Sequence, residues 1–217
     1  MHYDFTVFVG FSISIAVLIG WIRFKHLDQA YLPFLILITL GLSNEVLSFI
    51  VIKMKKSNAI NFNVYTLLEL VFLNWQFKQW KLFGKKNNWY YLILISSILF
   101  WLIENFVWKT INSFNSFFVI YSSYIILLMS ITMINRLVLK EQDLLIKNPV
   151  FLICIGFLFY FTYAVLVEAF WVTGYADSDV FRTRIYSILV YVNLMANLIY
   201  AIAVLWMPTK PKFILPS

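Results

Sequence analysis

The residues of this chain that could do chemistry are four glutamates, each set in a long apolar run: Glu45, Glu69, Glu104 and Glu168. A charged residue at the centre of a bilayer costs roughly 2.5–3.5 kcal/mol on insertion scales, so it faces protein or a water-filled cavity rather than lipid. A buried carboxylate also requires a hydrogen-bonding or cationic partner, or it takes up a proton. We therefore interpret these four glutamates as candidates for a ligand-binding site.

Other polar side chains recur at helical spacing in two of the apolar runs. Tyr65 and Glu69 lie one turn apart, and Asn63 falls on the neighbouring stripe of the same helix. The last run follows a polar stripe with spacings of 4, 7, 4 and 3, formed by Arg182, Tyr186, Asn193, Asn197 and Tyr200. Such a stripe in an apolar helix indicates the surface that faces other helices. The full candidate ligand-binding set is Glu45, Asn63, Tyr65, Glu69, Glu104, Tyr163, Glu168, Arg182, Tyr186, Asn193 and Asn197.

A second interpretation applies to each asparagine and tyrosine in this set. Polar side chains in membrane bundles often do no more than hydrogen-bond one helix to the next. Glu104 has a further alternative, because Lys109 is close enough in sequence to pair with it near the membrane interface.

The composition indicates the class of the protein. The 217 residues are 62% hydrophobic and only 12% charged, with a mean hydropathy of +0.83. Soluble domains average about 25% charged residues, so we predict a polytopic integral membrane protein. Each of seven apolar runs approaches the roughly 20 residues that span a bilayer as a helix. The sequence therefore predicts one all-α domain over 1–217, a bundle of seven transmembrane helices at about 5–22, 30–52, 59–77, 89–108, 116–135, 149–173 and 184–207.

Local capping signals agree with these boundaries. Asn148 before Pro149 predicts a capped start for the sixth helix, and Gly174 predicts the left-handed residue that ends it. The connections between helices are short, so we expect any output to pass through the helices or through a partner protein.

Lysines and arginines are distributed unequally between the two ends of the predicted bundle. Eleven lie in the connections after the first, third and fifth helices and in the C-terminal tail, and six lie on the opposite side. Because cytoplasmic loops carry the excess of these residues, we expect the N-terminus outside and the C-terminus in the cytoplasm. Glu45, Glu104 and Glu168 then fall in the outer half of the membrane, with Glu69 just below them, which predicts a cavity that opens outward.

Several classes of membrane protein lack their required residues here. No lysine lies within a predicted span, which excludes a retinal Schiff base. His2 and His26 cannot form a three-histidine zinc site, and neither HExxH nor GxSxG occurs. All five aspartates lie outside the apolar cores, and basic residues occur singly or in pairs rather than as a tract. We therefore expect no metal, no cofactor and no nucleic-acid partner, and an intramembrane enzyme is only the third hypothesis because nothing marks a nucleophile.

Four short motifs carry a family resemblance: Asn63-x-Tyr65-Thr-Leu-Leu-Glu69, Phe114-Asn115-Ser116, Asn148-Pro149-Val-Phe, and Asn193 with Asn197. This pattern resembles a group of small, largely uncharacterised seven-helix bacterial membrane proteins. Its architecture is similar to the seven-transmembrane sensory modules that precede bacterial signalling domains. The resemblance implies a location in the bacterial cytoplasmic (inner) membrane. It brings no established activity with it, and the similarity to sensory modules favours a sensory role without assigning one.

Two functions from different classes are open at this point. The leading one is a receptor-like sensory membrane protein that binds a small extracytoplasmic ligand in an outward-facing acidic and aromatic pocket. It would be surrounded by membrane lipid and would signal through a partner protein or a homo-oligomer. Glutamates, tyrosines and tryptophans suit a cationic or polyhydroxylated ligand.

The alternative is a small transporter in which the first three and last three helices are repeats joined by the fourth. Glu45 pairs with Glu168 at an offset of 123 residues, and Tyr65 pairs with Tyr186 at an offset of 121. Repeats of this kind place the substrate site near the midplane of the membrane, where Glu69 is expected.

Overall fold

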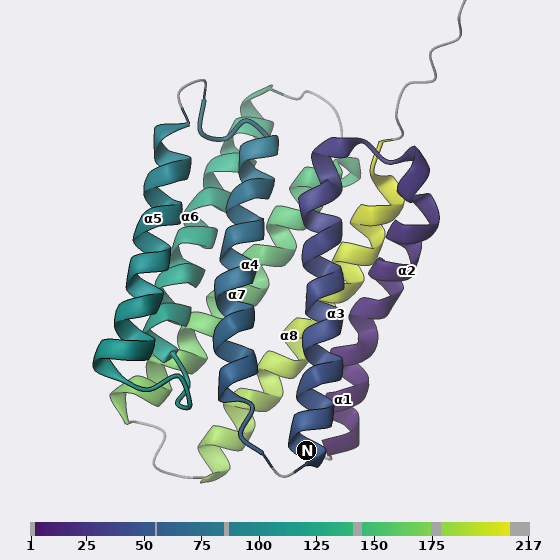
Figure 1. The fold of residues 1–217 in the computed structure, drawn as a ribbon. Helices are drawn as coiled ribbons and strands as arrows, with labels where there is room; N and C mark the ends of the chain where they lie inside the picture. The colour runs from purple at the N-terminus through teal and green to yellow at the C-terminus, as the bar shows by residue number, and fades with distance from the viewer. Residues whose placement is uncertain (1–2, 55, 85–86, 141–144, 175–178, 209–217) are drawn as a thin grey trace, which may run out of the picture.

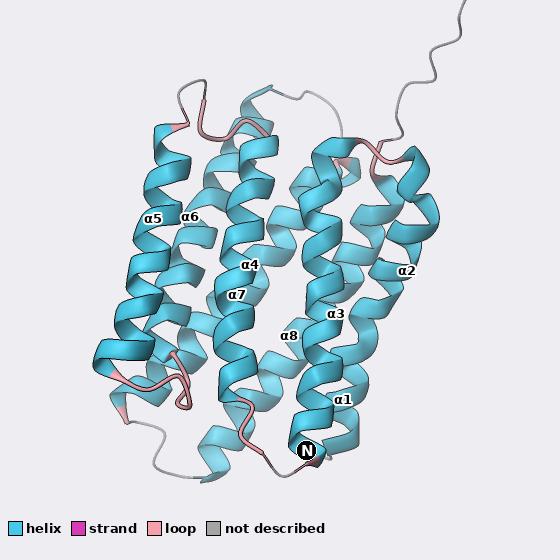
Figure 2. Cartoon of the chain, in the orientation of Figure 1, coloured by secondary structure: helices cyan, strands magenta, loops and turns pink. Residues whose placement is uncertain are grey.

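The computed structural model of the chain describes residues 3–54, 56–84, 87–140, 145–174 and 179–208, which form helices and short connections (Figures 1 and 2). The first helical segment consists of α1 (Tyr3–Gly10), a 3₁₀ turn (Phe11–Ile13) and α2 (Ser14–Arg23). The second, third and fourth are α3 (Leu32–Lys53), α4 (Ala59–Gln79) and α5 (Asn88–Leu102), which a π-helical segment (Ile103–Trp108) extends. The last three are α6 (Ser116–Lys140), α7 (Pro149–Thr173) and α8 (Asp179–Trp206).

This architecture confirms the all-α prediction, since no β-strand occurs in the described ranges. Six of the described segments are long and apolar enough to cross a membrane, as in an integral membrane protein. The exception is α4, which has 21 residues but carries asparagine, glutamine and glutamate side chains that lower its hydropathy. Asn63, Asn74 and Gln76 of α4 are 0% exposed, so other helices surround these polar groups.

Local capping explains where several helices begin and end. The side-chain oxygen of Asn148 accepts hydrogen bonds from the backbone N–H groups of Val150 (2.9 Å) and Phe151 (3.2 Å), and Gly174 ends α7 with a φ of 73°. Both features were predicted. In contrast, α6 runs on to Lys140 rather than ending near 135, and α8 begins at Asp179 rather than near 184. The apolar pattern stops at those predicted limits, but no glycine or proline interrupts the helical backbone there.

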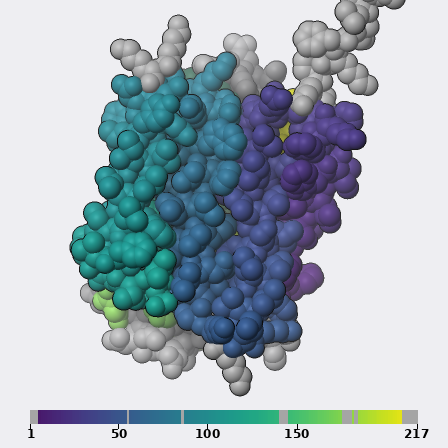
Figure 3. All heavy atoms as spheres, viewed as in Figure 1, coloured from purple at the N-terminus to yellow at the C-terminus, as the bar shows by residue number. Residues whose placement is uncertain are grey.

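The helices form two rows. In Figure 1, α3, α4 and α5 lie in front, and α6, α7 and α8 lie behind them. Within the rows, α4 packs between α3 and α5, and α7 packs between α6 and α8. The rows are joined on one side by α1 and α2, which contact both α3 and α8, and on the other by α6, which contacts α4 and α5. Side chains of α3, α4 and α5 cover the face that is turned to the viewer in Figure 3.

Aromatic rings fill the bundle near the beginning of α3. Phe34, Phe157 and Tyr200 are in mutual contact, with ring centroids 5.5–6.2 Å apart, and Phe77 packs against Phe157 at 6.2 Å. Gly156 allows the close approach of α7 and α8 here, because a side chain at that position would collide with the ring of Tyr200. This aromatic cluster (Phe34, Phe77, Phe157 and Tyr200) joins the two rows at the end of the bundle opposite the N-terminus.

Arg23, at the end of α2, joins α2 to the end of α8 at the same end of the bundle. The Arg23 guanidinium donates to the backbone carbonyl oxygens of Val204, Leu205 and Met207, at the end of α8. These carbonyls have no partner within the helix, so the cation both satisfies them and complements the negative end of the helix dipole.

Candidate functional site

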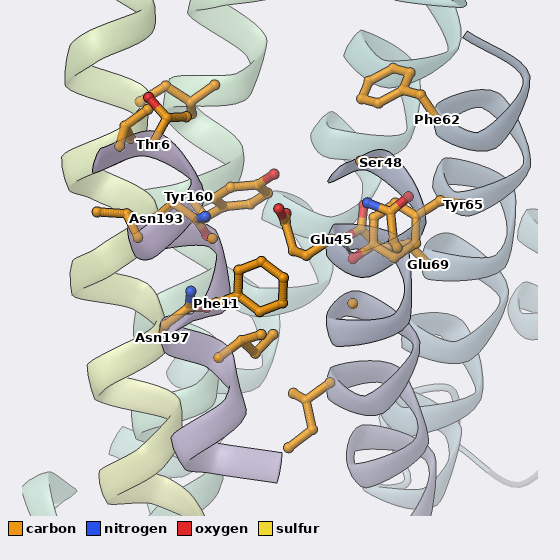
Figure 4. A pocket seen from close by; sticks show the side chains of 18 of the residues that line it. Thr6, Phe11, Glu45, Ser48, Phe62, Tyr65, Glu69, Tyr160, Asn193 and Asn197 are labelled. Atoms are coloured by element: carbon orange, nitrogen blue, oxygen red, sulfur yellow. Dashed lines mark hydrogen bonds between the residues drawn. The ribbon is translucent and has the colours of Figure 1, made fainter. Parts of the chain in front are cut away.

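A cavity of about 720 Å³ lies between α3–α4 on one side and α7–α8 on the other (Figure 4). Its lining includes residues of α1 and of the 3₁₀ turn that follows it, but none of the described lining residues belongs to α2, α5 or α6. Small-molecule sites usually measure about 300–1,000 Å³, so the volume suits such a ligand. Phe34, Phe157 and Tyr200 of the aromatic cluster close the cavity at the end opposite the N-terminus.

Three of the four glutamates line this cavity. Glu45 comes from α3, Glu69 from α4 and Glu168 from α7. The phenol of Tyr160 on α7 lies close enough to interact electrostatically with all three carboxyl groups. None of the described lining residues is a lysine or an arginine. The cavity therefore combines carboxyl and phenol groups without a protein cation in its wall.

The absence of a side chain at Gly10 of α1 makes room for the Glu45 side chain of α3. Figure 4 shows the side chain of Glu45 extending from α3 into the middle of the cavity, toward the side on which Tyr160 lies. A Cβ atom at Gly10 would lie 2.5 Å from Oε2 of Glu45, and a Cβ atom at Gly41 would lie 3.5 Å from the Tyr65 hydroxyl oxygen. The backbone of α1 thus approaches the Glu45 carboxyl group more closely than any larger residue at position 10 would allow.

Hydrogen bonds within the lining leave some polar atoms free. The Tyr65 hydroxyl donates to Oε1 of Glu69 (3.0 Å), and the Asn197 amide nitrogen donates to Oγ of Ser12 (2.9 Å). Tyr200 is only 8% exposed, and its hydroxyl has no hydrogen-bond partner among the described residues. Buried polar atoms are almost always hydrogen-bonded to protein, water or ligand, so such a group on a cavity wall marks a place for a ligand atom or water.

A polar network joins α3 to the beginning of α4 beside the cavity. The Asn61 amide nitrogen donates to Oδ1 of Asn44 (2.8 Å) and to Oγ of Ser48 (3.1 Å), and Ser48 also accepts from the Asn58 amide (2.9 Å). Asn44, Ser48 and Asn58 line the cavity as well, so this network fixes the wall from which Glu45 projects.

Asn63 lies outside the cavity, in a separate buried network. Its amide nitrogen donates to Oδ1 of Asn105 (2.8 Å) and to the carbonyl oxygens of Ile111 (3.1 Å) and Ser113 (2.7 Å). Its Oδ1 accepts from the backbone N–H of Asn115 at 3.1 Å. Asn63 therefore binds the connection between α5 and α6 to α4, which is the helix-joining role that was the alternative for this residue.

Glu104 also lies outside the cavity, in the π-helical end of α5. One carboxylate oxygen accepts from the ammonium of Lys109 (3.0 Å) and from the backbone N–H of Phe117 (3.1 Å), and the other accepts from the N–H of Phe118 (2.5 Å). The carboxyl group is 0% exposed and caps the first turn of α6. These contacts occupy both carboxylate oxygens. The N–H groups in the first turn of α6 have no acceptor within that helix, and the Glu104 carboxylate supplies one for two of them.

The remaining members of the candidate set divide as follows. Tyr65, Tyr186, Asn193 and Asn197 line the cavity, whereas Tyr163 of α7 does not. Arg182 belongs to α8, but its side chain falls outside the part of the structure that is described.

The sequence analysis left several lining residues out of the candidate set. Tyr200 continues the polar stripe of α8, and that stripe was the signal that could have included it. Tyr160 stands among Phe157, Phe159 and Phe161, so no pattern distinguishes it from packing residues. Gly10 matters only through its contact with Glu45, which depends on how α1 and α3 pack.

The acidic groups do not form a metal centre. Among the described residues, no three or more histidine, cysteine, aspartate or glutamate side chains lie close enough together to hold a metal ion. The three lining glutamates come from three different helices, α3, α4 and α7.

Comparisons with models of known protein families, with curated proteins and with solved structures give no match for this chain.

Proposed function

We propose that the protein is a receptor-like integral membrane protein that binds a small organic cation in the cavity between α3–α4 and α7–α8. The observation that carries the proposal is the presence of three glutamates in the lining, with no lysine or arginine among the described lining residues. Glu69 has Tyr65 as a hydrogen-bond donor, and no described side chain donates to Glu45. An ammonium group would supply the missing charge, and the tyrosine rings would add cation–π attraction.

The proposal includes a topology of seven spans. In this topology α4 is counted as a span in addition to the six apolar ones, because it runs beside α3 and α5 over a similar length (Figure 1). The excess of lysine and arginine places the N-terminus outside the bacterial inner membrane and the C-terminus in the cytoplasm. The closed, aromatic end of the cavity then faces the cytoplasm, and the Glu45 side faces outward.

The aromatic cluster offers a route for output. Phe34 comes from α3, Phe77 from α4, Phe157 from α7 and Tyr200 from α8, so every wall of the cavity contributes to it. A ligand that draws α7 or α8 toward α3 would repack these rings, because close-packed interiors change between discrete arrangements. A partner protein or a second copy of the chain would detect that change at the cytoplasmic end.

The test is a binding measurement on the purified protein in lipid nanodiscs. Butylammonium, butyrate and 1-butanol present the same apolar chain with positive, negative and no charge, and the melting temperature reports binding to the folded state. We expect stabilisation by butylammonium alone, and a weaker effect in Glu45→Gln and Glu69→Gln. Asp28→Asn is the matched control, because Asp28 is exposed and lies outside the cavity. Equal responses to the three compounds would refute the proposal.

A second candidate, a small transporter, is favoured by the pattern of helix packing. If α2, α3 and α4 are exchanged with α6, α7 and α8 in that order, each pair of packed helices is replaced by another pair that also packs together. The pair α2–α3 becomes α6–α7, α3–α4 becomes α7–α8, and α2–α8 becomes α6–α4. The fourth segment, α5, lies at the edge of the bundle (Figure 1). Transporters built from parallel repeats have this arrangement, with the substrate between the repeats. Uptake of radiolabelled butylammonium into proteoliposomes would favour the transporter, and binding without uptake would favour the receptor.

A further inference from the structure

Two of the lining glutamates lie on opposite walls of the cavity. Glu45 projects from α3 and Glu168 belongs to α7, which are the two helices that the packing exchange described above interchanges. Tyr160 and Tyr186 each interact electrostatically with both carboxyl groups. The two phenols and the two glutamates therefore lie in the same part of the cavity lining.

This arrangement does not suit a single compact charge. A metal ion needs several ligands that converge on one point, and no group of three or more such side chains occurs among the described residues. The Glu168 carboxyl group has a hydrogen bond to the Ser116 side chain, so a monovalent organic cation bound at Glu45 would leave Glu168 with that hydrogen bond but without a cation in the cavity. Two carboxyl groups on opposite walls of one cavity are best matched by a molecule with two separate cationic groups.

The protein cation near Glu168 is Lys109, and its ammonium group already has hydrogen-bond partners. Lys109 lies within electrostatic range of Glu168, but its ammonium donates to Glu104 (3.0 Å) and to the carbonyl oxygen of Phe114 (3.1 Å). Lys109 is not among the lining residues. The cavity side of Glu168 therefore faces no described protein cation.

We propose that the ligand is a linear aliphatic diamine or polyamine, with one ammonium group bound at Glu45 on α3 and a second at Glu168 on α7. This inference rests on the proposed function, whose site and charge preference it narrows. The methylene chain would lie along the tyrosine rings and the apolar lining residues Phe11, Ile38 and Val190. Tyr200 is 8% exposed and lines the same cavity. Its hydroxyl has no described protein partner, and an N–H group of the ligand could donate a hydrogen bond to it.

The experiment compares 1,4-diaminobutane with 1-aminobutane, whose chain has the same length and one charge fewer. Isothermal titration calorimetry on the protein in nanodiscs gives both dissociation constants, and 1,4-butanediol is the uncharged control. We expect the wild-type protein to bind the diamine at least tenfold more tightly than the monoamine. In Glu45→Gln and in Glu168→Gln this ratio should fall toward one, because each variant lacks one of the two carboxyl groups on the opposite walls that would bind the two ammonium groups.

Glu69→Gln serves as the comparison within the cavity. Glu69 lies on α4 and is hydrogen-bonded by Tyr65, so its loss should weaken both amines by similar factors and leave their ratio unchanged. Melting temperatures close to that of the wild type show that each variant is folded. A diamine preference that persists in Glu168→Gln would overturn the inference, as would equal affinities of the wild type for the two amines. If the two amines bind with equal affinity and more tightly than 1,4-butanediol, the proposed cation site stands. That site fails if neither amine binds.

Discussion

Replacing Glu104 by glutamine separates its role from that of the glutamates in the cavity. The carboxylate accepts three hydrogen bonds, from the N–H groups of Phe117 and Phe118 and from Lys109. A glutamine of the same shape has one acceptor oxygen, so its NH₂ group must face at least one of these donors. A buried backbone N–H that loses its acceptor costs about 1–3 kcal/mol. Loss of the ion pair adds up to about 1 kcal/mol, since Lys109 is 30% exposed.

We therefore expect Glu104→Gln to lower the free energy of unfolding by about 1–4 kcal/mol. The assay is reversible unfolding in mixed detergent micelles, with Asp28→Asn as the control. Asp28 also accepts a backbone N–H, from Ala30 at 2.9 Å, but at an exposed position where an asparagine oxygen can replace it. The folded Glu104→Gln protein should bind butylammonium as the wild type does. Unchanged stability, or a loss of binding in a protein of unchanged stability, would contradict this account of Glu104.

Three further changes test other parts of the structure. Gly10→Ala should displace the Glu45 carboxyl group and weaken butylammonium binding while the melting temperature stays near that of the wild type; unchanged affinity would show that the contact is unimportant. Asn63→Ala should free the connection at 109–115, which hydrogen exchange would detect as loss of protection confined to that region. Gln76→Leu removes bonds of 2.7 Å to two backbone groups near the beginning of α3 and should cost about 2–5 kcal/mol of stability without altering ligand affinity.

Depth along the helices was the most predictable property of the site. The 1.5 Å rise per residue fixes how far a side chain lies from the end of its helix, so Glu45, Glu69 and Glu168 could be placed at similar levels from sequence. The structure brings these three to one cavity. The helix boundaries at Asn148 and Gly174 were predictable for a similar reason, because capping depends on residues next to each other in sequence.

The position of each helix within the cross-section of the bundle was not predictable, and the position of α5 decides the role of Glu104. Its expected depth agrees with that of the other glutamates, but α5 lies at the edge of the bundle and contributes no described residue to the cavity lining. The connection at 109–115 then folds back so that the first turn of α6 meets the carboxyl group. Both facts depend on contacts between distant segments, which the periodicity of a single helix does not encode.

Hydrogen bonding, more than burial, separates the polar groups that join helices from those that face the cavity in this bundle. Gln76 and Asn63 are 0% exposed, and each uses both its amide nitrogen and its amide oxygen in hydrogen bonds within the protein. Glu45, Asn197 and Tyr200 face the cavity with acceptor or hydroxyl groups that no described residue satisfies. A satisfied polar group contributes to stability whatever its surroundings, whereas an unsatisfied one beside a cavity gains only when a ligand or water arrives. The three residues that gain in this way lie on α3 and α8, so an occupant of the cavity would bind the two rows of helices to each other.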